Sequence, residues 1–296
     1  MIFHLLALLS RVKTYFQIRT IQKNFNLDRK LGEKVNLKQR DESILIVIAH
    51  VVPVATTNKA DRLKKLKECL DSIKSSIAGY QHRIVILTKE GYSLHSLLPS
   101  YLIFDLQIHL SHQQDPMLVE FDAFEVFKEQ KDSYDHFLFL EDDILINDSW
   151  FLEKIKAFNT AIDNNEYVLL PHRFEYSEGI KYYLDQTTTY GTSTAHYHHN
   201  DTMSIEIENV KYCTYENPHA AWYCLTKKQL NSWIASGYKW KSKIVAFGPL
   251  ESAATFSLLE NFKFLKPHPR NINYFEVQHC GNKYIKQAGL IKQDHA

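Results

Sequence analysis

Three consecutive acidic residues, Glu141, Asp142 and Asp143, come directly after the apolar run 137–140, and apolar residues resume at Ile144. The apolar run predicts a strand in the interior of the fold. Carboxylates that adjoin the interior repel one another and lose hydration, so they need a positive partner. A hard divalent cation, which prefers oxygen ligands, would supply it. The alternative is a solvated acidic turn, but such turns usually carry Gly, Asn or Pro, which are absent here.

Apolar stretches rich in β-branched residues alternate along the chain with stretches of helical periodicity. Strands are predicted at 43–52, 83–88, 102–110, 136–140, 167–170, 204–212 and 222–225, and helices at 62–77, 116–130, 149–162, 226–236 and 248–259. Thr226 is the predicted N-cap of its helix. This alternation predicts an α/β fold with a mostly parallel sheet covered by helices, and such sheets bind ligands beyond the carboxyl ends of their strands. The polar stretch 175–209 predicts a long loop or a small antiparallel excursion.

The first 40 residues carry nine lysines and arginines against two acidic residues, in a chain whose net charge is only +1. Apolar residues recur there at helical spacing between Ile2 and Phe16. Such a basic amphipathic helix would lie on an anionic membrane surface through residues 1–25, and packing on its own domain or on a second subunit is the alternative. Its apolar run is too short to span a bilayer and lacks the basic start of a signal peptide. We therefore expect an N-terminal segment, 1–40, and one large domain, 41–296.

The four cysteines are widely spaced and form no Cys-x-x-Cys pair; they are Cys69, Cys213, Cys224 and Cys280. This pattern suggests neither a zinc site nor a dense disulfide framework and favours a reducing, cytoplasmic compartment. The near-neutral net charge of +1 gives no reason to expect a nucleic-acid partner. No G-x-G-x-x-G and no Walker loop occurs, so two common nucleotide-binding loops are absent from the sequence.

A buried strand ending in Glu-Asp-Asp resembles the DXD region of GT-A fold glycosyltransferases, and the resemblance covers roughly residues 43–285. It implies a mostly parallel central sheet flanked by helices, with a smaller antiparallel excursion on the acceptor side. It also implies Mn²⁺ or Mg²⁺ and a nucleotide-diphosphate sugar, most often a UDP-sugar. Successive strand residues point to opposite faces, so Glu141 and Asp143 share a side and Asp142 faces away. By the resemblance, Asp143 is the metal ligand, and the other two acids contact the ribose or a metal-bound water.

The loop after the first strand, with Ala49 and His50, would by the same resemblance border the nucleobase. Arg62 would reach a phosphate or the base; a solvated arginine on the helix surface is the alternative. Residues 171–175 follow a strand and are candidates for lining the sugar or acceptor site. Trp222 and Tyr223 would stack on a sugar ring or pack in the core, with the core favoured for Trp222.

His279, Gly281 and Lys283 resemble, with spacing one residue tighter on each side, the His-x-x-Gly-x-x-Lys motif of some GT-A transferases. In that motif the histidine binds the metal, and the glycine and lysine meet the diphosphate. A neutral imidazole complements carboxylate ligands, and a lysine ammonium neutralises phosphate. The alternative for His279 is an ordinary histidine near the C-terminus, in which case His268 is the second candidate ligand.

Glu251 follows Gly248 and Pro249 in the first turn of a predicted helix, where the helix dipole favours a carboxylate. GT-A transferases that invert configuration commonly place an acidic base near the start of a helix on the acceptor side. The resemblance therefore implies that Glu251 is the catalytic base, and an ordinary first-turn glutamate is the alternative.

Together these patterns predict a metal-dependent, inverting glycosyltransferase with one GT-A domain. The cation would be held by Asp143 and His279, and Lys283 would neutralise the leaving diphosphate. The expected acceptor is a glycan or a lipid-linked saccharide in surface polysaccharide synthesis, at the inner face of the cytoplasmic membrane. One alternative is a non-catalytic GT-A-like partner subunit that binds glycans or nucleotide sugars. A metal-dependent phosphohydrolase would need a second cluster of metal ligands near the strand ends, which the sequence does not offer.

Overall fold

The structure is a computed structural model that describes residues 40–184, 199–215, 218–237, 248–282 and 284–285. The chain divides into two units, Met1–Arg40 and Asp41–Ala296, and the fold below concerns the second. The predicted segment 1–25, the predicted phosphate contact Lys283 and part of the 175–209 stretch lie outside the described residues. No helix in the described ranges is both long enough and apolar enough to cross a bilayer.

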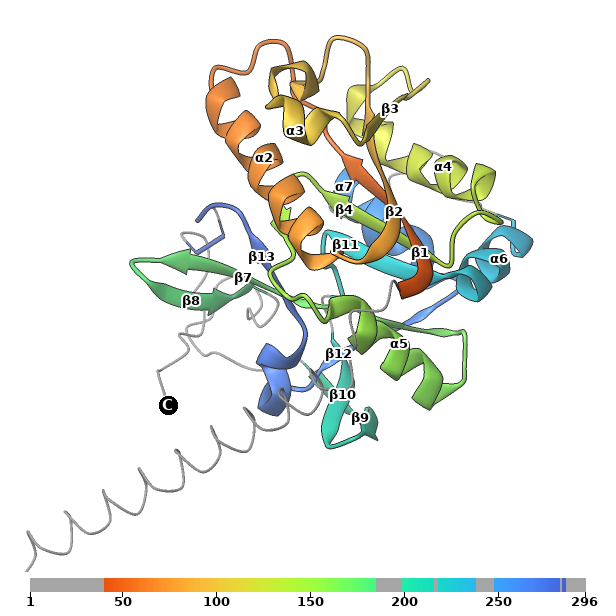
Figure 1. Ribbon diagram of the computed structural model, residues 1–296. Coiled ribbons are helices and arrows are strands. Elements are labelled where there is room, and N and C mark those ends of the chain that lie inside the picture. Colours follow the sequence, from red (N-terminus) through yellow and green to blue (C-terminus); the bar gives the residue numbers. More distant parts are fainter. Residues whose placement is uncertain (1–39, 185–198, 216–217, 238–247, 283, 286–296) are drawn as a thin grey trace, which may run out of the picture. The chain divides into compact units, whose positions relative to one another are not determined.

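A five-stranded sheet forms the centre of this unit (Figure 1). Its order is β11-β4-β1-β2-β3, with bounds Trp222–Thr226, His136–Glu141, Arg40–Ala49, Tyr80–Thr88 and Leu106–Leu110. β1 is parallel to β4 and β2 is parallel to β3, whereas β11 is antiparallel to β4. Ile44 to Ile48 are fully buried, as in a strand covered on both faces. The predicted mostly parallel central sheet flanked by helices is confirmed.

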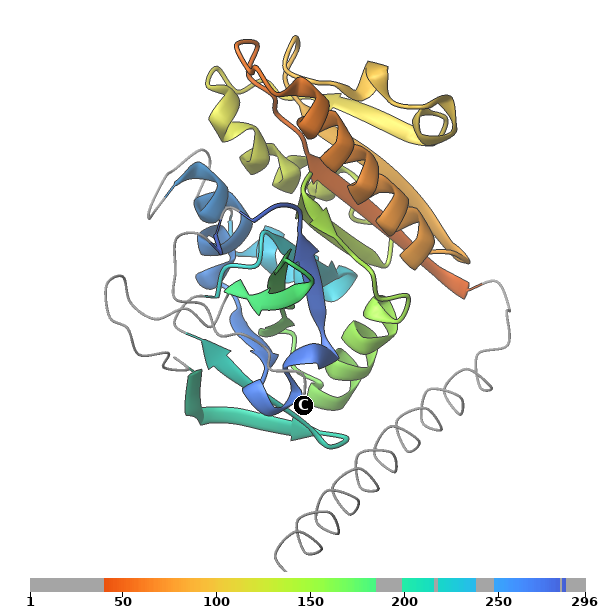
Figure 2. The same ribbon diagram turned by 90° about the vertical axis from the view of Figure 1, so that its left-hand side faces the viewer.

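Helices cover both faces of the central sheet (Figures 1 and 2). Helix α2 (Lys59–Ser76) lies on one face, and α4 (Ala123–Glu129) lies on the other. The other described α-helices that precede residue 240 are α3 (Ser100–Ile103), α5 (Phe151–Ile162) and α6 (Lys227–Ala235). Thr226 caps α6 as predicted, because its side chain accepts from the Gln229 N–H while the Gln229 side chain binds the Thr226 backbone.

Two four-stranded sheets extend the fold beyond the central sheet. One has the order β6-β12-β10-β9, with bounds Tyr167–Leu169, Lys263–Pro267, Val210–Tyr215 and His199–Ile207. The other has the order β5-β13-β7-β8, with bounds Ile144–Leu145, Glu276–His279, His172–Ser177 and Ile180–Tyr183. β7–β8 and β9–β10 are antiparallel hairpins, so the predicted 175–209 excursion contains strands in its described part.

Two predicted strands are wrong in their extent. Residues 102–110 contain the end of α3 followed by β3, because Leu102 packs into the core from a helical turn. Residues 204–212 span a hairpin turn between β9 and β10. Its two residues, Glu208 and Asn209, have φ angles of 48° and 71°, which suit the two-residue turns that match the twist of paired strands.

Two predicted helices are interrupted. Residues 116–130 begin with the 3₁₀ segment Pro116–Asp122, which precedes α4. Residues 248–259 consist of α7 (Pro249–Glu251), a π-helical turn (Ser252–Phe256) and α8 (Ser257–Leu259). Local propensity does not specify such changes of pitch, since they depend on contacts from elsewhere in the fold.

Trp222 and Tyr223 belong to the core. Each is at most 2% exposed. The Trp222 ring packs edge-on against Phe275, and the Tyr223 ring stacks on Phe139 at a centroid distance of 5.1 Å. Neither ring is accessible to a sugar, so the core alternative is the correct one for both residues. All four cysteines are buried, and no disulfide joins them.

Candidate functional site

A cleft of about 760 Å³ opens beyond the carboxyl ends of β1 and β4, beside α2 and the segment that follows β13. Six of the predicted site residues line it: Ala49, Arg62, Glu141, Asp142, Asp143 and His279. His50 is fully buried and does not line the cleft. Glu251 does not line it either, although its neighbour Leu250 does. The structure therefore brings most of the predicted residues to one cavity.

Asp143 and His279 meet because the strands next to them pair. β5 follows the three acids and pairs antiparallel with β13, so that His279 lies opposite Ile144. The Cys280 N–H donates to the Asp143 carbonyl oxygen at 2.8 Å. The His279 Nε2 atom lies 3.4 Å from Asp143 Oδ2. Sheet pairing thus holds together two residues that are far apart in the sequence.

Asp143 and His279 each stabilise the charged form of the other. Burial acts to raise the pKa of Asp143, but the hydrogen bond to His279 and the nearby charges of His279, Arg62 and Lys65 lower it below its ordinary value. Burial acts to lower the pKa of His279, whereas the hydrogen bonds to Asp143 and Glu175 raise it to about 9. The two side chains therefore form an ion pair in the cleft wall.

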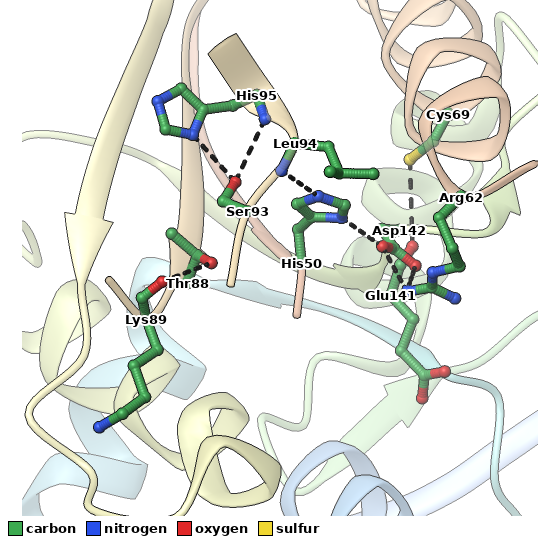
Figure 3. Close-up of polar contacts among 10 residues, drawn as sticks. All are labelled: His50, Arg62, Cys69, Thr88, Lys89, Ser93, Leu94, His95, Glu141 and Asp142. Carbon is green, nitrogen blue, oxygen red and sulfur yellow. Dashed lines mark hydrogen bonds and ion pairs between the residues drawn. The ribbon is translucent and has the colours of Figure 1, made fainter. Parts of the chain in front are cut away.

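Asp142 is bound by Arg62, which also lines the cleft, and by His50, which is fully buried (Figure 3). Arg62 Nη2 donates to both of its oxygens, at 2.9 and 2.7 Å. His50 Nδ1 lies 2.5 Å from Oδ2, and His50 Nε2 accepts from the Leu94 N–H at 3.1 Å. Because Nε2 is an acceptor, Nδ1 carries the hydrogen and donates to Asp142. These bonds connect β4, α2, the end of β1 and the segment after β2.

Glu141 points away from the Asp142 cluster in Figure 3. Burial, followed by the charge of Asp143, raises the pKa of Glu141 to about 8. Its Oε1 atom is buried without a hydrogen-bond partner among the described residues, and His219 Nε2 lies 3.9 Å away. A carboxyl group in this state can accept a hydrogen bond from a ligand hydroxyl or donate one to it.

Several residues that line the cleft were not predicted from the sequence, and two of them bear on ligand binding, Lys65 and Glu120. Lys65 follows Arg62 by one helical turn, and its Nζ atom lies 3.5 Å from Asp61 Oδ2. A Cβ atom at Gly281 would lie 3.8 Å from Lys65 Nζ, so this ammonium group also borders the segment after His279. The helical spacing of Arg62 and Lys65 was a usable signal, because residues three apart share a helix face.

The second missed residue is Glu120, in the 3₁₀ segment Pro116–Asp122. It lines the cleft and is 7% exposed, and its Oε2 atom has no hydrogen-bond partner within the described ranges. Burial, and then the charges of Glu141, Asp142, Glu251 and Asp143, raise the pKa of Glu120 well above its ordinary value. The sequence carried no signal for it, because the 3₁₀ turn breaks the helical periodicity.

We predict that Glu120→Gln stabilises the protein at alkaline pH. A carboxyl group whose pKa is raised in the folded state contributes most to stability when the pH is below its unfolded-state pKa. That stability is lost as the pH rises through the folded-state pKa. The unfolding free energy of Glu120→Gln relative to wild type should therefore increase between pH 5 and pH 8, by about 1.4 kcal/mol for each pH unit over which only the folded-state carboxyl stays protonated. Urea titrations would measure it, with exposed Glu129→Gln as the control. An increase no larger than that of the control would contradict the prediction.

The two remaining predicted residues occupy different surroundings. Glu251 lies in the first turn of α7, as expected, and its charge contributes to the raised pKa of Glu120. A Cβ atom at Gly248 would come within 2.9 Å of Glu251 Oε2, so a side chain at Gly248 would displace this carboxylate. His268, the second candidate ligand, instead caps the turn after it, with Nδ1 accepting from the Arg270 N–H at 3.1 Å.

Asp143 and His279 offer two of the ligands that a divalent cation needs, and the rest would have to come from elsewhere. Within the described ranges, no three His, Cys, Asp or Glu side chains are grouped so that they could hold a metal ion. A cation at Asp143 and His279 would therefore take its other ligands from phosphate oxygens and water, as Mg²⁺ does at nucleotide sites. Asp143 Oδ1 is buried without a hydrogen-bond partner in the described part of the chain, which suits a metal-facing oxygen.

Comparison with known proteins gives a likeness of fold only. No family model and no curated protein matches the sequence. Solved structures that resemble the chain include a mannose-1-phosphate geranyltransferase from Thermus thermophilus, with 10% identity, coverage of 76% of this chain and 73% of the other, and a TM-score of 0.40.

A second structure is a glycosyltransferase involved in glycosylation of the major capsid of PBCV-1, with 11% identity, coverage of 83% and 96%, and a TM-score of 0.35. A third is a protein described as a nucleotide-diphospho-sugar transferase from Desulfovibrio desulfuricans, with 10% identity, coverage of 77% and 80%, and a TM-score of 0.38. Scores this low carry no information about activity, which has to be argued from the cleft itself.

Proposed function

We propose that the cleft binds a nucleotide-diphosphate sugar and that the protein transfers the sugar to an acceptor hydroxyl. The observation that carries this proposal is the pairing of Asp143 with His279, at 3.4 Å, beyond the carboxyl end of a buried parallel strand. Such strand ends are where open α/β sheets bind nucleotides. Arg62 and Lys65 line the same cleft and supply positive charge for a diphosphate.

Asp143 and His279 would hold Mn²⁺ or Mg²⁺, and this cation would act as a Lewis acid that stabilises the departing nucleotide diphosphate. Lys65, whose ammonium group lies near Gly281, would add positive charge beside the leaving group, and Lys283 is a second candidate for that role. Ala49 lines the cleft near the end of β1 and would border the nucleobase. The donor we expect is a UDP-sugar.

On the acceptor side, Glu251 would accept the proton of a hydroxyl bound at the edge of the cleft, where its neighbour Leu250 lies, and an in-line attack would invert the anomeric carbon. Glu141 and Glu120 would hydrogen-bond hydroxyl groups, because each has a buried oxygen without a partner among the described residues. The acceptor would be a glycan or a lipid-linked saccharide of surface polysaccharide synthesis. Residues 1–25 would bring the protein to the cytoplasmic membrane face.

A thermal-shift panel of UDP and UDP-sugars, each with Mn²⁺ or with EDTA, tests this proposal. A ligand that binds only the folded state stabilises it by about 2.7 kcal/mol at 100 times its dissociation constant. We expect a clear rise in Tm for UDP and for one UDP-sugar, with Mn²⁺ only. The same result without Mn²⁺-dependent donor hydrolysis would favour the non-catalytic partner subunit. No shift with any nucleotide would contradict the proposal.

A further inference from the structure

Glu175 contacts two parts of the cleft wall at once, although it does not line the cleft. It lies on β7 and is fully buried. Its Oε1 atom is 2.8 Å from His279 Nδ1, and its Oε2 atom accepts from the Ile285 N–H at 3.2 Å. β7 and β13 are parallel, with Phe174 opposite Gln278. The next residues of the two strands, Glu175 and His279, therefore lie side by side.

The first contact fixes the histidine ring. When a carboxylate accepts a hydrogen from Nδ1, the Nε2 nitrogen is left to face the other side of the ring. On that side lies Asp143 Oδ2, at 3.4 Å. Metal-binding histidines commonly have such a carboxylate on their other nitrogen, which sets both the tautomer and the orientation of the ring.

The second contact fixes the backbone after Gly281. Tyr284 lines the cleft, and its ring packs against the His279 ring at a centroid distance of 5.1 Å. The Ile285 N–H that Glu175 binds directly follows Tyr284. A single buried carboxylate therefore holds the histidine and the backbone that carries the tyrosine.

We propose that Glu175 is a positioning residue that aims His279 Nε2 at Asp143 and anchors the Tyr284-Ile285 backbone beside it. Cation binding at Asp143 and His279 then depends on Glu175, which is not itself a ligand. This inference rests on the proposed function, since it assumes that the pair receives Mn²⁺ or Mg²⁺. It assigns Glu175 a role behind the site rather than in contact with the sugar.

The test is Mn²⁺ affinity with UDP present to supply the phosphate ligands. It is measured on the full chain from the electron paramagnetic resonance signal of free Mn²⁺ and corrected for a blank of Mn²⁺ and UDP alone. Glu175→Ala should weaken binding about 10- to 100-fold, the usual effect of removing a residue that orients a metal ligand. Glu175→Gln should weaken it less, because an amide oxygen can still accept from one of the two N–H groups. If Glu175→Ala does not fold, Glu175→Gln carries the test with an expected loss of about 10-fold.

Glu276→Gln is the matched control. Glu276 lies on β13 with His279 and accepts from Lys181 Nζ at 2.5 Å and from the Tyr183 hydroxyl at 2.6 Å. Its loss should lower the Tm but leave the Mn²⁺ affinity unchanged. A second readout is amide hydrogen exchange at Ile285, which should become faster in both Glu175 variants and stay at the wild-type rate in Glu276→Gln.

The outcomes separate this inference from the proposed function. If wild type binds Mn²⁺ and the Glu175 variants bind it equally well, the inference is overturned and the proposed cation site stands. Equal weakening in Glu276→Gln would also overturn it, because general loss of structure would then explain the effect. If wild type does not bind Mn²⁺ with UDP present, both the cation site and the inference are refuted.

Discussion

Replacing Asp142 by alanine is expected to lower the free energy of unfolding by about 3 kcal/mol, the low end for a buried ion pair, because the Arg62 side chain is 29% exposed. Asp142 is 3% exposed, and its carboxylate is bound by Arg62 and His50. Without it, the guanidinium group loses its counter-ion and the buried His50 Nδ1–H loses its acceptor. Asp142→Asn should be milder but still destabilising, because an amide has one acceptor oxygen where the carboxylate has two.

Urea unfolding would measure this effect, with Glu206→Ala as the control. Glu206 accepts from Arg270 Nη2 at 2.7 Å, but both side chains are about half exposed. Exposed pairs contribute about 0–1 kcal/mol, so the control should be nearly neutral. If Asp142→Ala cost no more than the control, the Asp142 carboxylate would have to be solvated and free to contact a ligand, as the predicted ribose contact requires.

Asp143→Asn is expected to reduce Mn²⁺-dependent hydrolysis of a UDP-sugar by about 100-fold or more. Loss of a residue that only orients a metal ligand costs about 10- to 100-fold, and loss of a direct ligand should cost at least as much. The substitution keeps the size of the side chain, and the Cys280 N–H still binds the backbone carbonyl of residue 143. The fold should therefore persist while the cation site fails.

The measurement is the rate of UDP release with saturating Mn²⁺, and the Mn²⁺ dependence of that rate gives the affinity. Asp105→Asn is the matched control, since Asp105 is exposed and does not line the cleft. It should hydrolyse the donor at the wild-type rate. If Asp143→Asn hydrolysed the donor at the wild-type rate, Asp143 would not be a ligand of the cation. The proposal of metal-dependent transfer would then lose its main support.

The central sheet was largely predictable from the sequence, because strands buried on both faces must be apolar along their whole length. The predicted strands 43–52 and 83–88 overlap β1 (Arg40–Ala49) and β2 (Tyr80–Thr88), with ends that differ by at most three residues. Thr226 was identifiable as a helix cap because its capping box with Gln229 is local. The hairpin turn at Glu208 and the 3₁₀ segment Pro116–Asp122 were not predicted, since their backbone conformations depend on strand pairing and packing.

The sequence by itself determined that three carboxylates follow a buried strand, because strand periodicity and the placement of charge are properties of neighbouring residues. Only the tertiary structure decided which partners each carboxylate contacts. Asp142 is bound by Arg62 and His50, whereas Asp143 meets His279 through the pairing of β5 with β13. Glu120 reaches the cleft from a 3₁₀ segment, and Glu175, in the predicted range 171–175, contacts His279 without lining the cleft. Such contacts between distant elements leave no periodic signal in the sequence.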